Sequence, residues 1–506
     1  MTAAAPRTHP NVLILMSDEQ RWDSLGHTGN PAAHTPHLDA LAGESTSFDA
    51  CYTPFPLCCP SRASLWTGRM PRHHHVLGNW QAIRPDLAEA GLARAFREAG
   101  YHTLYCGKWH VPGTTPHRMG FTDTAAIPAV LGGKDRGRYI EPYRAHVSEL
   151  GYELLPDHIE NLTPPDAAAL RDAPHRGTAR IPYEHFLEPW QTGEFLAALD
   201  RRPADRPWLA VCSYNAPHFP MIVPEPYDRI IDRDRIRLPP GLRGTRAAGK
   251  PREVAESEFA HKYAGLDEDG WTELIAHYLG LCALVDAQVG AVLERLRQTG
   301  ELDNTIVVFT SDHGDMMGTH GLMEKGHLLH YEEALRVPLL IRHPDTAGGV
   351  RTRNPVSVVD IAATVAELAG VAWDEESDGI SAAAMVGAPH AAATRGHVTA
   401  ESVLYGMSAD AAGQYRDPAS WDTATDALNL SVRTRELRYI YRSRDTDELY
   451  DHTDDPHEQH NRATDPQYAQ QRAELRVLLA REVADVFGTV AADLNPRNTT
   501  YQLEER

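Results

Sequence analysis

Two clusters of polar residues could together bind a metal ion. Asp18 and Glu19 directly follow one apolar run, and Asp312 and His313 directly follow another. Three carboxylates and an imidazole are suitable ligands for a divalent cation, which prefers mostly oxygen donors. Taken alone, the Asp-Glu pair is more simply explained as the cap of a helix. The matching second cluster therefore strengthens the prediction of a metal site.

The apolar runs before these clusters are predicted to be buried strands. Residues 11–16, 208–214 and 305–310 are apolar and rich in β-formers, whereas residues 86–98 and 272–299 carry apolar side chains at helical spacing. This alternation predicts an α/β fold with a large mixed, mainly parallel sheet flanked by helices. Ligands bind beyond the carboxyl ends of such strands, so the polar clusters should meet at one edge.

A smaller second unit is predicted at the end of the chain. Short strand patterns and a final helix indicate a C-terminal α+β domain over 381–506, next to a catalytic domain over 1–380. Within the catalytic domain, residues 112–205 and 223–262 are rich in Pro, Gly and charge, with weak periodicity. Loops of that length are more often functional than idle, so we interpret them as insertions that select the substrate.

Composition excludes several classes of partner. The 506 residues include 49 Lys and Arg against 70 Asp and Glu, a formal net charge of -21, and no basic stretch stands out. Nucleic acid and anionic membranes are therefore not expected partners. The apolar run near the N-terminus is too short for a secretory signal, and no stretch reaches the ~18 apolar residues of a membrane helix. We expect a cytoplasmic protein.

The six cysteines form no Cys-x-x-Cys pair, which argues against a disulfide framework or a zinc ribbon. Cys58 and Cys59 are adjacent, but adjacent cysteines form a strained, rare disulfide, so a redox or metal pair is disfavoured. The histidine run at 73–75 lies in a turn-like segment without partner ligands. Surface histidines are therefore favoured there over a metal tract.

The Cys58-Cys59 pair opens an ordered series of short motifs. Residues 58–62 read Cys-Cys-Pro-Ser-Arg, which fits a C-x-P-S-R signature. The series continues through Thr67-Gly68-Arg69, Gly100-Tyr101-His102-Thr103, Gly107-Lys108-Trp109-His110, Pro217-His218, Ser311-Asp312-His313-Gly314, Lys325-Gly326 and Glu448-Leu449-Tyr450-Asp451. In content and order it resembles the type I sulfatases of the alkaline phosphatase superfamily, over nearly the whole chain. The resemblance implies the alkaline-phosphatase-like fold.

The resemblance also implies an unusual nucleophile. A formylglycine-generating enzyme would convert Cys58 to Cα-formylglycine, whose hydrated aldehyde has two hydroxyls. One hydroxyl attacks the sulfate ester, and the other expels sulfate afterwards, an exit that a thiolate adduct lacks. A divalent metal would bind Asp18, Glu19, Asp312, His313 and the formylglycine at 58.

The remaining site residues are assigned by the same resemblance. Arg62, Lys108 and Lys325 would surround the sulfate oxygens and stabilise charge in the transition state. His218, with Lys325, would protonate the leaving alcohol, and His110 would remove the second hydroxyl proton. Asn79 would orient the nucleophile or the substrate.

Two positions depart from the common family pattern. Glu19 stands where Asp, Gln or Asn is more usual, and His313 stands where many sulfatases have Asn. A histidine ligand resembles the subgroup with phosphonate monoester hydrolases and choline-sulfatase-like enzymes, and nitrogen ligation mildly favours a transition metal. We expect Ca²⁺ first, with Mn²⁺ or Mg²⁺ as alternatives.

The leading hypothesis is therefore a sulfatase that hydrolyses a small organic sulfate monoester to an alcohol and inorganic sulfate. The alternative is a phosphonate or phosphate ester hydrolase with the same nucleophile, against which Gly107-Lys108-Trp109-His110 argues. A non-catalytic scaffold is disfavoured, because the nucleophile, the cations and the metal ligands are all present. The alcohol is left open, and so is assembly into a homo-oligomer.

Overall fold

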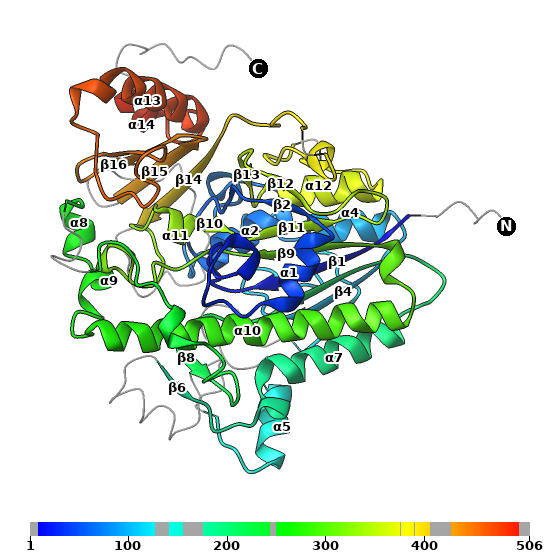
Figure 1. Cartoon of the computed structure of the whole chain (residues 1–506). Helices are drawn as coiled ribbons and strands as arrows, with labels where there is room; N and C mark the ends of the chain where they lie inside the picture. Colours follow the sequence, from blue (N-terminus) through cyan, green and yellow to red (C-terminus); the bar gives the residue numbers. More distant parts are fainter. Residues whose placement is uncertain are drawn as a thin grey trace.

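An eight-stranded sheet forms the centre of the structure, a computed structural model (Figure 1). Its strands are β1 (Asn11–Ser17), β2 (Thr46–Phe48), β4 (His102–Gly107), β5 (Asp123–Ala125), β7 (Trp208–Ser213), β9 (Thr305–Ser311), β11 (Leu339–Arg342) and β12 (Val350–Thr352). The structure describes residues 9–126, 141–154, 176–242, 249–374, 376–388, 390–404 and 427–494. Parts of both expected insertions, residues 127–140, 155–175 and 243–248, lie outside this range.

The sheet is mainly parallel, as predicted. The strand order is β12-β2-β11-β9-β1-β7-β4-β5, and β1 lies between β9 and β7, parallel to both. Only β11 runs antiparallel to its neighbours β9 and β2. The α/β fold class is confirmed, and the parallel register brings the ends of β1 and β9 together at Ser17 and Ser311.

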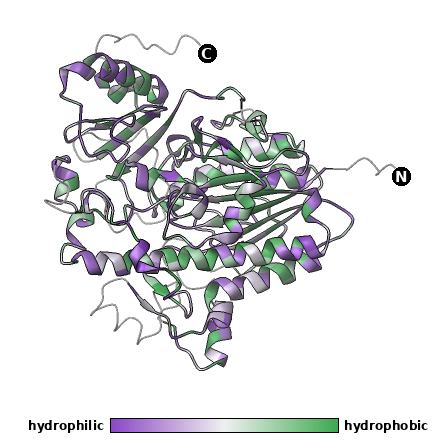
Figure 2. Cartoon of the chain, in the orientation of Figure 1, coloured by the Kyte–Doolittle hydropathy of each residue, from purple (hydrophilic) through white to green (hydrophobic). Residues whose placement is uncertain are grey.

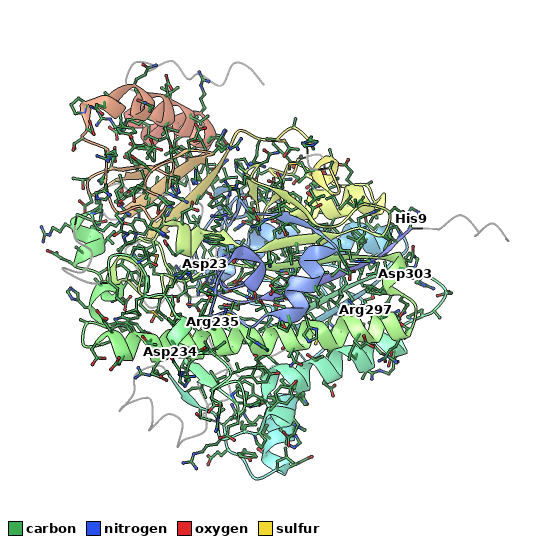
Figure 3. The ribbon with its side chains drawn as sticks, in the orientation of Figure 1. His9, Asp23, Asp234, Arg235, Arg297 and Asp303 are labelled. Atoms are coloured by element: carbon green, nitrogen blue, oxygen red, sulfur yellow. The ribbon has the colours of Figure 1, made fainter. Side chains whose placement is uncertain are left out.

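Alternate residues of β1 pack into separate cores on the two faces of the sheet. Val12, Ile14 and Met16 belong to one buried cluster, and Leu13 and Leu15 belong to the other. This is the period of two expected of a strand, and a strand buried on both faces becomes an uninterrupted apolar run. Figure 2 shows hydrophobic residues along the central strands, and the charged side chains labelled on the periphery in Figure 3, such as Asp234 and Arg297, are exposed.

Helices cover both faces of the sheet, with α10 and α7 on one side and α2, α4 and α12 on the other (Figure 1). The helices of this part are α1 (Pro36–Gly43), α2 (Cys58–Thr67), α3 (Pro71–His74), α4 (Leu92–Glu98), α5 (Glu141–Glu149), α7 (Leu187–Arg201), α8 (Arg252–Ala255), α9 (Glu258–His261), α10 (Glu268–Gln298), α11 (Glu332–Leu335) and α12 (Asp360–Ala369). Short strands complete it: β3 (Cys51–Tyr52), β10 (Arg336–Val337) and β13 (Val356–Ser357) form one sheet, and β6 (Arg176–Thr178) and β8 (Met221–Val223) another.

Two helices differ from their predicted bounds. The helix expected over 86–98 begins at Leu92, because Gly91 has φ 121°, outside the helical region, and a Cβ there would lie 2.4 Å from the Trp66 carbonyl. α10 begins before residue 272, since the Asp267 side chain caps it by accepting from the Gly270 amide. α10 is also long and apolar enough to span a membrane, but 89% of its most apolar window is buried inside the protein.

The C-terminal part has its own antiparallel sheet, in the order β14-β15-β16-β17. Its elements are β14 (His397–Leu404), β15 (Ala427–Thr434), β16 (Leu437–Arg442), β17 (Glu448–Asp451), α13 (Ala469–Val483) and α14 (Gly488–Leu494). Apolar residues of β15, β16 and the two helices form a separate core that includes Leu430, Tyr439 and Leu479.

Buried ion pairs join this C-terminal sheet to α11. Arg438 of β16 donates to Glu458 at 2.6 Å and also to Glu332 of α11, and Arg433 of β15 reaches Glu332 at 2.9 Å. Arg438, Glu332 and Glu458 are at most 4% exposed. In a low-dielectric interior each of these charges depends on its partners, so the two parts are held in one fixed geometry.

Replacing Arg438 should destabilise the protein strongly. Arg438→Met removes the guanidinium that bridges two buried carboxylates: Glu458 loses its arginine, and Glu332 keeps Arg433 and Arg336. We therefore expect the free energy of unfolding to fall by about 3 kcal/mol. Denaturant-induced unfolding followed by circular dichroism measures it. The matched control is Arg435→Met, on the exposed turn before β16, for which a change below about 0.5 kcal/mol is expected. Equal losses in both variants would contradict the proposed importance of the network.

Candidate active site and metal centre

The two predicted polar clusters meet at the carboxyl ends of β1 and β9, around a single arginine. Arg62 donates through Nε to Asp312 Oδ2 at 2.8 Å and through Nη2 to Asp18 Oδ2 at 2.9 Å. Its Nη1 donates to the Lys108 carbonyl and to Ser213 Oγ. Arg62 and both aspartates are fully buried, so the guanidinium fixes the two carboxylates relative to each other.

Cys58 is the first residue of α2 and faces the same carboxylates. Its Sγ lies 3.1 Å from His313 Nε2 and 3.8 Å from Asp18 Oδ1, and the residue is 1% exposed. Burial, reinforced by Asp18, raises the pKa of the Cys58 thiol to about 12. The unmodified thiol is therefore a poor nucleophile at neutral pH.

His313 is oriented as a metal ligand. Its Nδ1 donates to the Gly314 carbonyl at 2.9 Å, which leaves the lone pair on Nε2. Nε2 lies 3.9 Å from Asp18 Oδ1 and 3.8 Å from Asp312 Oδ1. The donor atoms of Asp18, Cys58, Asp312 and His313 all lie within 4.8 Å of one another, and all four residues are buried.

Glu19 adds a third carboxylate, one oxygen of which lacks a hydrogen-bond partner among the described residues. Glu19 Oε1 and Asp315 Oδ2 are buried and make no hydrogen bond within the described part of the chain. Burial raises the pKa of Glu19 well above its usual range, against the opposing charge of Lys325 and with help from Asp315. A cation would remove this cost of burial, so the donor set fits a divalent metal with mostly oxygen ligands.

Lys325 and His218 form a pair above these carboxylates. Lys325 Nζ contacts Glu19 Oε2 and lies 3.2 Å from His218 Nε2. His218 Nδ1 donates to the Phe219 carbonyl at 2.7 Å, so Nε2 accepts a hydrogen bond from the lysine ammonium. The transferable proton therefore lies on Lys325 in the resting site, next to the imidazole that can relay it.

The other predicted residues lie on nearby loops. Lys108, directly after β4, places Nζ 2.6 Å from Asp18 Oδ2, and the carboxylate outweighs the effect of burial and raises the lysine pKa. Asn79 Oδ1 accepts from the Cys59 amide at 3.0 Å, so it fixes the first turn of α2. His110 is buried two residues beyond Lys108, with φ 53°. Its role in proton removal stays a prediction.

Two contributors were missed by the sequence interpretation. Ser213 at the end of β7 binds Arg62, and Asp315 faces Glu19. Asp315 carried a signal, as the second acidic residue within the five positions 311–315. Ser213 carried none, because its hydroxyl is one of many within a buried strand.

The histidine run at 73–75 is structural, and the prediction that it lies on the surface is wrong for His74. His74 is fully buried, with Nε2 2.9 Å from Ser64 Oγ of α2. His73 bridges two distant carboxylates, with Nδ1 2.7 Å from Asp378 and Nε2 2.7 Å from Asp485. The run anchors α3, which follows the helix of Cys58.

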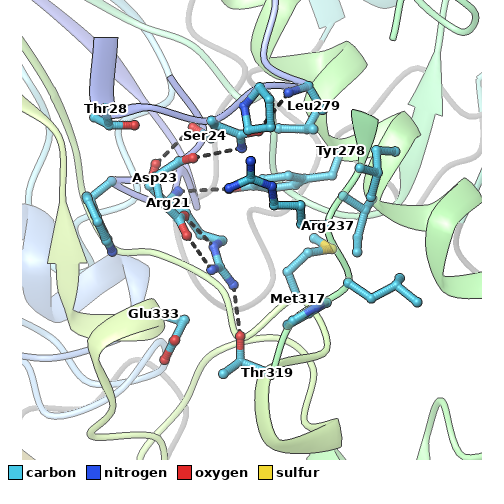
Figure 4. A pocket seen from close by; sticks show the side chains of 18 of the residues that line it. Arg21, Asp23, Ser24, Thr28, Arg237, Tyr278, Leu279, Met317, Thr319 and Glu333 are labelled. Carbon is cyan, nitrogen blue, oxygen red and sulfur yellow. Dashed lines mark hydrogen bonds and ion pairs between the residues drawn. The ribbon is translucent and has the colours of Figure 1, made fainter. Parts of the chain in front are cut away.

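A cavity of about 510 Å³ lies between the loop after β1 and the N-terminal half of α10 (Figure 4). Its wall includes Arg21 and Tyr278, and none of its lining residues was predicted for catalysis. The Arg21 amide donates to Tyr278 Oη at 2.8 Å, and that hydroxyl donates to the Glu19 carbonyl at 2.9 Å. The wall of the cavity thus supports the loop that carries Glu19.

Comparison with known proteins finds relatives over most of the chain. The family model described as Sulfatase matches residues 10–371, and the model described as N-sulphoglucosamine sulphohydrolase, C-terminal, matches residues 318–485. The chain is 26% identical to the ulvan-active sulfatase of Formosa agariphila, over 95% of this chain and 82% of that protein. It is 30% identical to the arylsulfatase of Clostridium perfringens, over 74% and 77%.

A solved structure extends the similarity to three dimensions. The phosphonate monoester hydrolase from Silicibacter pomeroyi superposes with a TM-score of 0.76, covering 94% of this chain and 96% of that one. The two sequences are 24% identical. At this identity the likeness shows the fold alone.

The His73 bridge predicts a specific pH dependence of stability. Burial lowers the pKa of His73, but its bonds to Asp378 and Asp485 outweigh burial and raise the pKa to about 9 from the ordinary 6.5. The protonated ring therefore stabilises the fold fully below about pH 6.5, and this contribution is lost as the pH rises through about 9. Arg72, the nearby cation, opposes the shift.

We expect His73→Gln to lower the free energy of unfolding by about 2 kcal/mol near pH 6 and by much less near pH 9.5. Denaturant titrations of both proteins at the two pH values give this difference. A loss of the same size at both pH values would show that the ring acts by packing rather than by charge.

Proposed function

Because this chain belongs to the sulfatase family, whose members hydrolyse sulfate esters, we propose that it cleaves a small organic sulfate monoester to an alcohol and inorganic sulfate. One observation carries the proposal. Cys58 lies at the start of α2, against Asp18 and His313 and among the fixed cations Arg62 and Lys108. A sulfate group would meet a nucleophile position, metal ligands and positive charge in one buried site.

The family typically depends on a metal and on formylglycine, and both fit this site. Conversion of Cys58 to formylglycine would supply a hydroxyl nucleophile in place of a thiol with a raised pKa. A divalent cation held by Asp18, Glu19, Asp312 and His313 would polarise the sulfate oxygens and acidify that hydroxyl. We propose Ca²⁺ as the ion, with Mn²⁺ or Mg²⁺ as alternatives, and a formylglycine-generating enzyme as a partner during maturation.

The protein's own cations orient the sulfate. Lys108 and Lys325 each contact a carboxylate of the metal site, at Asp18 and Glu19. With those carboxylates on the cation, the ammonium groups can donate to sulfate oxygens, where fixed charge stabilises the transition state without reorganisation. Arg62 keeps Asp18 and Asp312 in place, so we assign it a positioning role more than direct contact with sulfate.

Proton transfer to the leaving alcohol is assigned to the Lys325 and His218 pair. The ammonium of Lys325 holds the proton, and His218 Nε2 lies within hydrogen-bond reach of it. Asp312, or the neighbouring Asp18, can accept the proton of the attacking hydroxyl, and His110 is proposed to remove the second one.

Peptide mass spectrometry tests the nucleophile. In active protein, the peptide that spans residues 56–69 should carry formylglycine at position 58. Cys58→Ala should lower kcat/KM by at least about 10³-fold without unfolding the protein. Cys59→Ala is the matched control, since its Sγ packs in the core and its amide still reaches Asn79. An active protein with an unmodified thiol at 58 would overturn the mechanism.

Relative rates on a sulfate and a phosphonate ester distinguish the proposed sulfatase from the alternative, a phosphonate ester hydrolase. We expect a higher kcat/KM for an aryl sulfate than for the matched aryl phosphonate monoester, because the chain belongs to the sulfatase family and keeps the sulfatase-like Gly107-Lys108-Trp109-His110 element. Both substrates are monoanions, so Lys108 and Lys325 alone would not separate them. Steady-state kinetics on both substrates with one enzyme preparation decide this. A higher kcat/KM for the phosphonate would assign the chain to phosphonate ester hydrolysis.

A further inference from the structure

The exposure of side chains marks where the site opens. Cys58 is 1% exposed and the Lys325 side chain 6%, whereas the side chain of His218 is 15% exposed. The proton donor pair therefore lies between the buried nucleophile and solvent. A substrate held by its sulfate would extend its alcohol part outward past His218, toward the residues beyond it.

Phe219 is the first side chain beyond His218. Its ring stacks on the imidazole with centroids 4.9 Å apart and planes 19° apart. Lys325 Nζ lies 4.6 Å from the ring centre and Lys262 Nζ lies 5.0 Å from it. Two ammonium groups thus contact one aromatic ring at the opening of the site.

Lys262 lies at the end of α9 and is held at this opening by Glu324. The two side chains form an ion pair, and Tyr263 Oη also donates to Glu324 Oε1, at 3.3 Å. The Lys262 side chain is 35% exposed and that of Glu324 is 14% exposed. Of the two lysines that contact Phe219, Lys325 is the inner one and Lys262 is the more exposed. Glu324, which holds Lys262, directly precedes Lys325 in the sequence.

Backbone hydrogen bonds around Glu324 fix its position relative to α9. Glu324 has φ 69°, a left-handed conformation that costs a non-glycine residue of the order of 1 kcal/mol. Its carbonyl accepts from the Met316 amide at 2.9 Å, and the Met323 amide donates to the Phe259 carbonyl of α9 at 3.1 Å. α9 and the loop that carries Lys325 are therefore joined, which fixes Lys262 relative to the sulfate site.

We propose that Lys262 is a specificity-determining residue that binds a second anionic group on the alcohol part of the substrate, a carboxylate or another sulfate. This inference rests on the proposed sulfatase function. Glu324 would hold the lysine in place in the free enzyme, and the anion of the substrate would take over the ammonium on binding. Phe219 would form the apolar floor between the two anion sites.

The charges at the opening favour an anion over a cation. Phe219 already contacts two ammonium groups, so a third cation above the ring would be repelled. Glu324 is the single acid that the structure describes in contact with Lys262, and it can be exchanged for a substrate anion without loss of a buried pair. Recognition of two anions by two fixed lysines gives selectivity for substrates that carry both.

Kinetics of Lys262 variants test the inference. The substrates are 4-nitrophenyl sulfate and its analogue with a carboxylate ortho to the sulfate ester. Lys262→Met should lower kcat/KM about tenfold for the carboxylated substrate and less than about twofold for the parent. Lys262→Arg should retain most of the preference. Arg252→Met is the matched control, because it removes an 81% exposed charge from neighbouring α8 and should change neither value.

Each other outcome would overturn the inference. If Lys262→Met lowers both values equally, or neither, the lysine does not read a second anion. If Glu324→Gln lowers kcat/KM for choline sulfate while Lys262→Met raises it, the opening recognises a cation instead.

A binding measurement distinguishes failure of the proposed sulfatase function from failure of the proposed role of Lys262. Calorimetric binding of the carboxylated sulfate to Cys58→Ala should weaken about tenfold when Lys262→Met is added. If the converted enzyme hydrolyses neither sulfate but this difference in binding persists, the proposed function fails and the role of Lys262 stands. If turnover is observed without any difference in binding or kcat/KM, the role of Lys262 fails alone.

Discussion

The buried contact of Arg62 with Asp18 and Asp312 is the constraint on which the site depends. A guanidinium without solvent needs both carboxylates, and each carboxylate needs the guanidinium. These groups come from α2 and from the ends of β1 and β9, and Arg62 also binds Ser213 of β7 and the carbonyl of Lys108 after β4. The arginine can be satisfied only when four strand ends and one helix are in register, so folding of the sheet and assembly of the site are a single event.

Much of this arrangement was predictable from the sequence, because burial leaves a pattern. Strands covered on both faces are uninterrupted apolar runs, and their ends were followed by Asp18, Asp312 and His313. Local sequence was less informative where a single backbone conformation decides the outcome. The periodic pattern before Leu92 continues through Gly91, whose positive φ and close approach to Trp66 prevent a longer helix. His74 gives no sign of its burial, since the serine it contacts lies one helix away.

Ion pairs between residues far apart in the sequence were the other feature that the sequence could not predict. Arg438 and Glu332 are 106 positions apart, and Lys262 and Glu324 are 62 apart. No periodic pattern or motif marks the residues of either pair as partners. Because a charged residue is usually solvated, the sequence alone favours surface positions for them. The structure shows that the first pair joins the C-terminal sheet to α11, while the second lies at the opening beside His218. The first pair is buried and fixes geometry, whereas the second is partly exposed and can exchange partners.

The burial of Cys58 has a consequence for the order of events in the life of the protein. A thiol that is 1% exposed, in contact with Asp18 and His313, cannot enter the active site of another enzyme once the sheet has formed. If Cys58 is converted as proposed, the modification must precede folding, when residues 56–69 are still an extended peptide. A chain that folds before conversion would keep its thiol permanently. The active fraction of any preparation would then depend on the rate of Cys58 conversion relative to the rate of folding.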